Sequence, residues 1–146
     1  MKASSIHQPW ASLIALGEKH FETRTWKPTH QGEILIHASR TFSEAERLLL
    51  QQEPFKAVFA RHGIKYSTDL PTGAPIALAT IDKVLLAEEI IHDLSDQERS
   101  FGDFRQGRYA WLLKDITRLT NPPPLPGRQA IFDIPDQLVL PCLLPR

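Results

Sequence analysis

The first forty residues constrain the fold most, because they predict a strand, a short helix and two more strands in quick succession. Residues 2–8 (KASSIHQ) favour a strand, and Pro9 suits the first turn of the following helix, where a missing N–H costs little. Apolar residues then recur on one helical face until Gly17 ends the helix. The next two segments, 19–26 (KHFETRTW) and 33–39 (EILIHAS), have the composition of strands.

Few helices follow. Ser43 and Glu46 form a capping-box pattern that predicts a helix ending before Pro54, and a second helical segment is expected over 55–62. Another short helix is expected after Ser95, within an acidic stretch that otherwise shows no clear pattern.

Two further segments predict strands. Residues 74–87 form a long apolar run with a bend expected near Asp82, and residues 108–116 form a run of large β-favouring residues. Many short strands with few helices predict an α+β fold, a small mixed β-barrel flanked by a few helices. At 146 residues the chain is expected to form one domain, 1–146.

The C-terminal segment is rich in proline, with seven of the twelve prolines in residues 122–145. Proline enforces extended backbone and removes a donor from a sheet ladder. With the β-prone residues 129–134, this predicts an ordered edge segment that wraps the domain. The alternative is a ligand for proline-reading domains, which would make the chain a protein-interaction module of a transcription or translation assembly.

Charge is balanced overall, with 17 Lys and Arg against 17 Asp and Glu. This excludes a uniformly basic nucleic-acid-binding surface, but the ends of the chain are mildly basic, and residues 82–103 hold seven acids against two bases. If the two ends meet, they form a local positive surface; a plain solvated mosaic of charges is the alternative. The acidic stretch is expected to lie elsewhere.

The expected compartment is the cytoplasm. A single cysteine, Cys142, cannot form an internal disulfide, the N-terminus does not resemble a signal peptide, and no apolar run is long enough for a membrane span. No membrane partner is therefore expected. The sequence also lacks the spacings typical of metal ligands, so neither a metal nor a cofactor is predicted.

The most informative segment is residues 17–24 (GEKHFETR), with Gly17, Lys19, Glu22 and Arg24 at fixed offsets. In a strand, Glu22 and Arg24 share one face, close enough for the carboxylate and guanidinium to meet. An exposed ladder of charges on an edge strand is the plain alternative.

This segment resembles the motif of the ASCH domain (activating signal cointegrator homology), a member of the PUA-like group of RNA-binding barrels. The family pattern has a glycine, a lysine, a glutamate and an arginine at these four offsets. The resemblance implies that the segment lines a cleft between the barrel and the first helix. It further implies a ligand such as RNA or a nucleoside- or nucleotide-like small molecule.

The resemblance assigns candidate roles to the residues around the motif. Lys19 and Glu22 are the candidate catalytic residues, and the remaining candidates bind the ligand. Cations hold phosphate, an aromatic face stacks on a base, and a carboxylate accepts from exocyclic N–H groups. The expected ligand-binding residues are Arg24, Trp10, Trp26, His37 and Tyr109.

Two kinds of activity remain open. One branch of the family consists of acetylcytidine amidohydrolases, in which the motif lysine is followed three residues later by a threonine. In this chain Glu22 stands at the position of that threonine. The same branch has a further glutamate later in the sequence, for which Glu88, Glu89 and Glu98 are the candidates. Other members have been proposed as ribonucleases. The first hypothesis is therefore binding of RNA or a nucleotide, and the second is a hydrolase acting on a modified nucleoside or on RNA.

Overall fold

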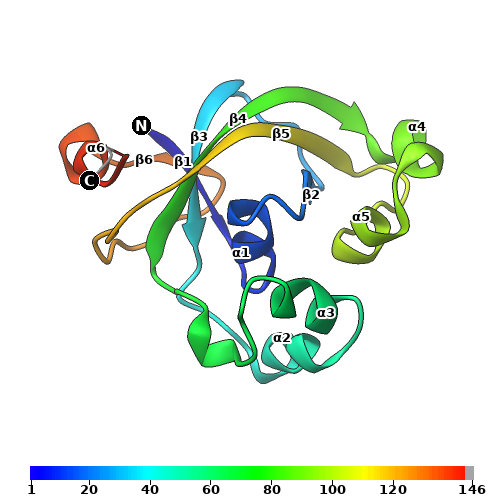
Figure 1. Cartoon of the computed structure of the whole chain (residues 1–146). Coiled ribbons are helices and arrows are strands. Elements are labelled where there is room, and N and C mark those ends of the chain that lie inside the picture. Colours follow the sequence, from blue (N-terminus) through cyan, green and yellow to red (C-terminus); the bar gives the residue numbers. More distant parts are fainter. Residues whose placement is uncertain (144–146) are drawn as a thin grey trace.

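The computed structural model describes residues 1–143 and contains one curled sheet of six strands in the order β2-β5-β4-β3-β1-β6 (Figure 1). The parallel pair β1–β3 is flanked by antiparallel neighbours, so the sheet is mixed. Its curl gives a half-barrel, which confirms the predicted fold class. The strands are β1 (Lys2–Ile6), β2 (Phe21–Arg24), β3 (Gly32–Ala38), β4 (Ala74–Leu86), β5 (Tyr109–Arg118) and β6 (Ile131–Asp133).

Helix α1 (Trp10–Ala15) lies on the concave side of the sheet, as Figure 1 shows. Its apolar side chains pack with those of β3, β4 and β5 to form the main core, which includes Ile14, Ile36 and the indole of Trp111. The helix ends as predicted at Gly17, which has φ +76°, a conformation that favours glycine.

Three short helices form a separate lobe below the sheet (Figure 1). They are α2 (Glu44–Leu48), the 3-10 turn η1 (Leu49–Gln51) and α3 (Phe55–Ala60). Both halves of the predicted capping box between Ser43 and Glu46 are present at the start of α2. The loop before β4 contains a further 3-10 turn, η2 (Ser67–Asp69).

The acidic stretch folds into α4 (Ala87–Ile90), η3 (Ile91–Asp93) and α5 (Asp96–Phe101). The helix expected after Ser95 is therefore present, and the Ser95 side chain caps it by accepting from the Glu98 N–H at 3.1 Å. The sequence did not predict α4. Strand β4 shifts register between Ile81 and Lys83, which confirms the bend expected near Asp82.

The proline-rich segment is part of the fold. Strand β6 pairs with β1 at the edge of the sheet, and Leu125 donates its N–H to the Gly73 carbonyl, which confirms an edge segment that wraps the domain. Helix α6 (Asp136–Leu143) was not predicted, because Pro141 lies inside it. Burial of Val139 and Cys142 against the sheet offsets the hydrogen bond that this proline removes.

The predicted strand 19–26 is shorter in the structure. The N–H groups of Glu18 and Lys19 both bond to the Leu13 carbonyl, so these residues form the turn after α1 rather than the start of β2. The strand also ends at Arg24, before the turn that contains Pro28. Within residues 1–143, no helix has the length and apolar character needed to cross a membrane.

Candidate functional site

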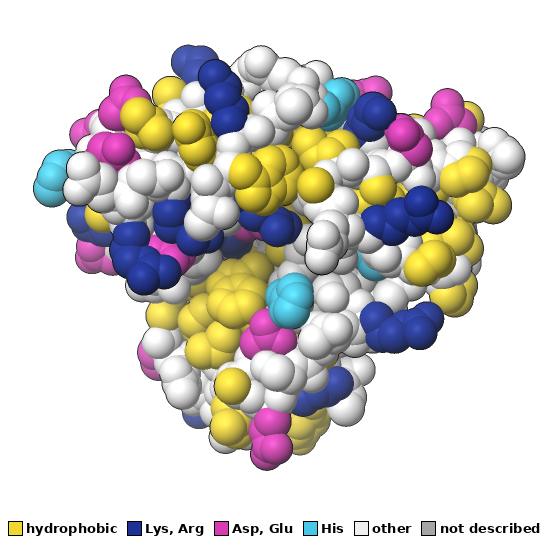
Figure 2. Space-filling view, turned by 180° about the vertical axis from the view of Figure 1, so that it is seen from behind, with side chains coloured by type: hydrophobic (Ala, Val, Ile, Leu, Met, Phe, Trp, Pro, Cys, Tyr) yellow, Lys and Arg dark blue, Asp and Glu magenta, His cyan; other side chains and the backbone are white. Residues whose placement is uncertain are grey.

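A cleft of about 410 Å³ lies where β2, the end of β1, α1 and the segment after α5 meet. Figure 2 shows the molecule from behind, with a hollow whose floor is apolar; Lys and Arg side chains lie above it and to its left, and a His and an acidic side chain lie to its right. The cleft is lined by Ile6, His7, Trp10, Lys19, Glu22, Thr23, Arg24, Ser100, Phe101, Gly102, Asp103 and Arg108.

Lys19 forms the deepest charged part of the cleft. Its side chain is only 2 % exposed, and Nζ donates to the Phe101 carbonyl at 2.9 Å. Burial lowers the pKa of the Lys19 ammonium, although the nearby carboxylates of Glu22 and Glu98 oppose that effect. The structure therefore holds a lysine that loses its proton more readily than an exposed one.

Glu22 and Arg24 form the predicted pair. The Arg24 Nε donates to Glu22 Oε2 at 3.2 Å, and Nη2 donates to the Ser5 carbonyl at 2.8 Å. The guanidinium thus joins β2 to β1 across the mouth of the cleft. The pair is not an exposed ladder of charges, since Glu22 is 8 % exposed and Arg24 is half-buried.

Side chains, rather than another strand, cover the outer edge of β2. Glu98 accepts from the backbone N–H of His20 at 2.8 Å and of Phe21 at 3.3 Å. This contact fastens α5 to the strand that carries the motif. Of the three glutamates considered from the sequence, Glu98 alone is buried and close to Lys19; Glu88 and Glu89 are exposed.

The backbone N–H and carbonyl of Thr23, on the same edge of β2, form hydrogen bonds with side chains that line the cleft. Glu22 Oε1 accepts from the Thr23 N–H at 3.1 Å, and Arg108 Nη2 donates to the Thr23 carbonyl at 3.2 Å. Arg108 Nε is buried and has no partner among the described residues. An unpaired buried donor is costly, so a ligand oxygen at this position would relieve it.

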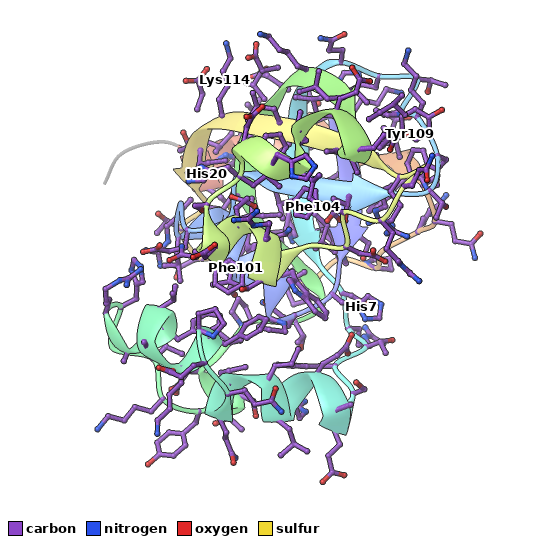
Figure 3. All side chains as sticks on the ribbon, turned by 90° about the vertical axis from the view of Figure 1, so that its right-hand side faces the viewer. His7, His20, Phe101, Phe104, Tyr109 and Lys114 are labelled. Atoms are coloured by element: carbon purple, nitrogen blue, oxygen red, sulfur yellow. The ribbon has the colours of Figure 1, made fainter. Side chains whose placement is uncertain are left out.

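The aromatic candidates are divided between two places. Trp10 lines the cleft, half-buried between the main core and the lobe. Phe101 also lines it, and Figure 3 shows its ring projecting from α5 toward the lobe, where it contacts Phe55 at 5.0 Å between ring centroids. Trp10 is thus the aromatic candidate from the sequence that the structure brings to Lys19 and Glu22.

The other three predicted ligand-binding residues lie outside this cleft. Trp26 packs edge-on against Trp111, with centroids 5.1 Å apart, and its ring lies near the Arg24 guanidinium. His37 is 1 % exposed in β3, which pairs with β1 and β4 rather than with β2. Tyr109 is opposite Arg24 in the sheet register but does not line the cleft, and Figure 3 shows it well above His7.

Sequence reasoning missed the wall contributed by residues 100–103. The acidic stretch was expected to lie elsewhere, and this is wrong: its C-terminal end closes the cleft opposite Lys19. Asp103 accepts hydrogen bonds from Arg105, which hold its pKa at about 2, and it lies 3.5 Å from Arg108 Nη1. The cleft therefore contains Lys19 and two arginines against two carboxylates.

Residues 1–143 contain no group of three His, Cys, Asp or Glu side chains arranged to hold a metal ion. Cys142 is buried and does not line the cleft. The chemistry available in the cleft is that of a buried amine, two carboxylates, two guanidinium groups, an imidazole and an indole.

Comparison with known proteins gives consistent results. The chain is 20% identical over 134 residues to human activating signal cointegrator 1 and 21% identical over 137 residues to the mouse protein. Each match covers 92% of this chain and only 22% of the relative, so the chain spans about a fifth of their length.

The fold is similar to crystal structures of an ASCH protein from Zymomonas mobilis. The native protein superimposes with a TM-score of 0.57 at 16% identity, over 93% of this chain and 88% of that one. A point variant of the same protein gives 0.56 at 17% identity, over 93% and 89%. The model of the ASCH domain matches residues 5–122, which include the motif, the cleft and most of the sheet, and the chain therefore belongs to the ASCH domain family.

Proposed function

We propose that the cleft binds one nucleotide of an RNA strand, or a nucleotide-like small ligand, through both its base and its phosphate. The observation that carries this proposal is the convergence of Lys19, Glu22, Arg24, Trp10 and Arg108 on one cavity of about 410 Å³. A cavity of that volume suits a small ligand or a single base. The ASCH domain has a PUA-like fold associated with RNA binding, which supports the same conclusion.

Each side chain has a chemical role in this proposal. Trp10 provides a face for stacking. Glu22 retains acceptor capacity beyond its two hydrogen bonds, so it accepts from the amino group of a base. Arg24 and Arg108 donate to phosphate or carbonyl oxygens, and the buried Arg108 Nε is already unpaired. Lys19 supplies a positive charge at the floor.

Binding should be tested with single-stranded oligonucleotides and nucleotides, and measured by fluorescence anisotropy and by the change in tryptophan fluorescence. Arg24→Lys keeps the positive charge but loses the planar guanidinium, which donates hydrogen bonds in two directions. Trp10→Leu removes the aromatic face on which a base would stack. Both are expected to weaken binding at least tenfold, about the worth of one base stack or one charged hydrogen bond. Arg118→Ala, an exposed arginine on β5 away from the cleft, is the control.

Thermal unfolding of each variant separates lost binding from lost folding. If both variants bind as the wild type does, the cleft is not the site. If the wild type binds none of the RNAs and nucleotides, the proposed function is wrong.

A second candidate function is hydrolysis of a modified nucleoside or of RNA. It is favoured by one observation: Lys19, whose pKa is lowered by burial, lines the same cleft as the carboxylate of Glu22. In this reaction Glu22 takes a proton from water, and the hydroxide adds to the acyl carbon while Lys19 stabilises the oxyanion. The amine then leaves with the proton, giving acetate and cytidine from acetylcytidine.

Turnover of acetylcytidine and of RNA should be measured for the wild type and for Glu22→Gln. The amide accepts from the Thr23 N–H but cannot take a proton, so turnover is expected to fall at least a hundredfold while folding is retained. Absence of turnover in the wild type, or unchanged turnover in the variant, would remove this candidate and leave the binding proposal in place.

A further inference from the structure

A second hollow, of about 620 Å³, adjoins the cleft. The two share His7 and Arg24 as lining residues, so the cleft and the hollow meet at these side chains. The other lining residues come from both ends of the chain: Ser5, Trp26, His37, Ser39, Arg40, Thr41, Gly127, Arg128, Gln129 and Ala130. The ends thus meet, as one of the two interpretations of the charge distribution predicted.

The hollow has an unbalanced positive charge. Arg24, Arg40 and Arg128 line it together with two histidines, and none of the twelve lining residues is acidic. Arg24 pairs with Glu22 and His7 contacts Glu46, so the unmatched charge is that of Arg40 and Arg128. Arg40 and Arg128 are exposed, and neither forms an ion pair within the described part of the chain. Most other described arginines contact a carboxylate: Arg61, Arg99, Arg105 and Arg108 each do so.

The floor of the hollow is built by a hydrogen-bonded chain of polar groups. His37 Nε2 lies 2.6 Å from the Leu125 carbonyl, which only accepts, so this nitrogen carries a proton. In the neutral ring Nδ1 then accepts from the Ser5 hydroxyl, 3.1 Å away. The histidine is fully committed to holding the tail segment on the sheet, which explains its burial without a contact to ligand.

The tail segment is held closely against this floor. A Cβ added at Gly127 would lie 2.8 Å from both His37 Cε1 and Ser5 Oγ, so only glycine fits without displacement. Arg128 follows directly, so its backbone is held at the same hollow that Arg40 lines. Two unpaired guanidinium groups on a fixed frame form a site for an anion with several oxygens.

We propose that this hollow binds the phosphodiester group of the nucleotide next to the one held in the cleft, so that an RNA strand runs across Arg24 from one to the other. This inference rests on the proposed function, because the strand is positioned by the base in the cleft. Trp26, at the edge of the hollow, offers its ring to the second base.

The test compares a mononucleotide, a dinucleotide and a tetranucleotide of the same base on the wild type and on the double variant Arg40→Ala/Arg128→Ala. The wild type is expected to bind the dinucleotide about tenfold more tightly than the mononucleotide, the worth of one charge-assisted hydrogen bond to phosphate. The double variant should lose this gain while retaining its affinity for the mononucleotide. Its salt dependence for the tetranucleotide should fall by about 0.7 in log–log slope for each phosphate that an arginine no longer neutralises.

Arg118→Ala should change neither quantity. A double variant that keeps the wild-type length dependence and salt slope would overturn the second site while leaving the cleft intact as a nucleotide site. Wild-type protein that binds none of the three would instead contradict the proposed function. Inorganic phosphate is tested as a competitor of the tetranucleotide for the wild-type protein. If it competes as well as the dinucleotide does, the hollow is a site for free phosphate, and the proposed path of the RNA strand is wrong.

Discussion

Lys19 has an unusual environment for its residue type, being almost fully buried with a single carbonyl as its hydrogen-bond acceptor. Lysine is rarely buried without a partner, because desolvation of the ammonium is costly. Here Glu22 and Glu98 lie near enough to offset part of that cost. A buried amine of this kind is a common feature of binding and catalytic sites.

The burial of Lys19 predicts a pH dependence of stability. Its pKa is lowered from 10.5 in the folded protein, so between the lowered value and 10.5 the unfolded chain binds more protons than the folded one. The free energy of unfolding contributed by this group therefore rises with pH in that window, by about 1.4 kcal/mol for each unit of lowering. Lys19→Met has no such titrating group. The free energy of unfolding of the wild type should therefore increase relative to that of Lys19→Met between pH 7 and pH 10.5.

Urea unfolding at several pH values measures this difference. Lys83→Met, at an exposed position of β4, serves as the control and should show no such trend. A difference between wild type and Lys19→Met that stays constant with pH would contradict the prediction.

At the level of single residues, the sequence was informative where partners are close along the chain. Lys19, Glu22 and Arg24 fall within six residues, and local geometry alone brings them to one cleft. Trp26 was expected to bind the ligand beside the motif, but the strand ends at Arg24, so the alternation of side chains does not carry Trp26 into the cleft. Arg108 and Asp103 reach the cleft only through the pairing of β5 with β2, which residue spacing does not reveal.

Among the elements, β2 depends on α5. Its four residues pair with β5 on one side, and Glu98 of α5 covers its first N–H groups on the other. An edge strand this short is weak unless its free groups are satisfied. The acidic helix is thus a structural support for the motif.

Glu98→Gln tests that support. The amide has one acceptor oxygen for two N–H donors, and a charge-assisted contact is replaced by a neutral one, so a loss of about 1–3 kcal/mol in the free energy of unfolding is expected. Amide hydrogen exchange at His20 and Phe21 should accelerate. Glu89→Gln, at an exposed position of α4, is the matched control; unchanged exchange at both amides would show that Glu98 does not hold the strand.

Elements with clear end signals were predicted well, and the others were not. The capping box at Ser43 and the cap at Ser95 each marked a real helix, because a side chain satisfies the first N–H groups locally. Helix α4 has no such side-chain cap, and α6 contains a proline, so neither has a local signal. Both exist because tertiary packing buries their apolar residues.

At the scale of the whole molecule, the two ends of the chain contact each other and complete the edge of the sheet and the core beside it. Strand β6 pairs with β1, the N-terminal ammonium contacts Asp136, and Val139 of α6 is completely buried against Ala3 and Leu35. Sequence composition predicted an edge segment in the tail but not the helix that follows it. Long-range contacts of this kind depend on the complete fold.

Val139→Asp would place an unpaired carboxylate in that contact. A loss of more than about 2 kcal/mol in the free energy of unfolding is expected, because the charge has no partner there. Leu138→Asp changes the neighbouring residue, which is 39 % exposed, and should cost much less. Equal losses in the two variants, measured by urea unfolding, would contradict the packing of α6 described above.

The contact between Glu22 and the Thr23 N–H restricts which residues can stand at the third fixed position of the motif. A side chain there must accept a hydrogen bond from the backbone, or the edge of β2 keeps an unpaired donor. Glutamate meets that requirement because its side chain is long enough to turn back to the N–H of the next residue. The carboxylate at position 22 therefore has two structural roles at once, because the same side chain lines the cleft and satisfies the exposed edge of β2.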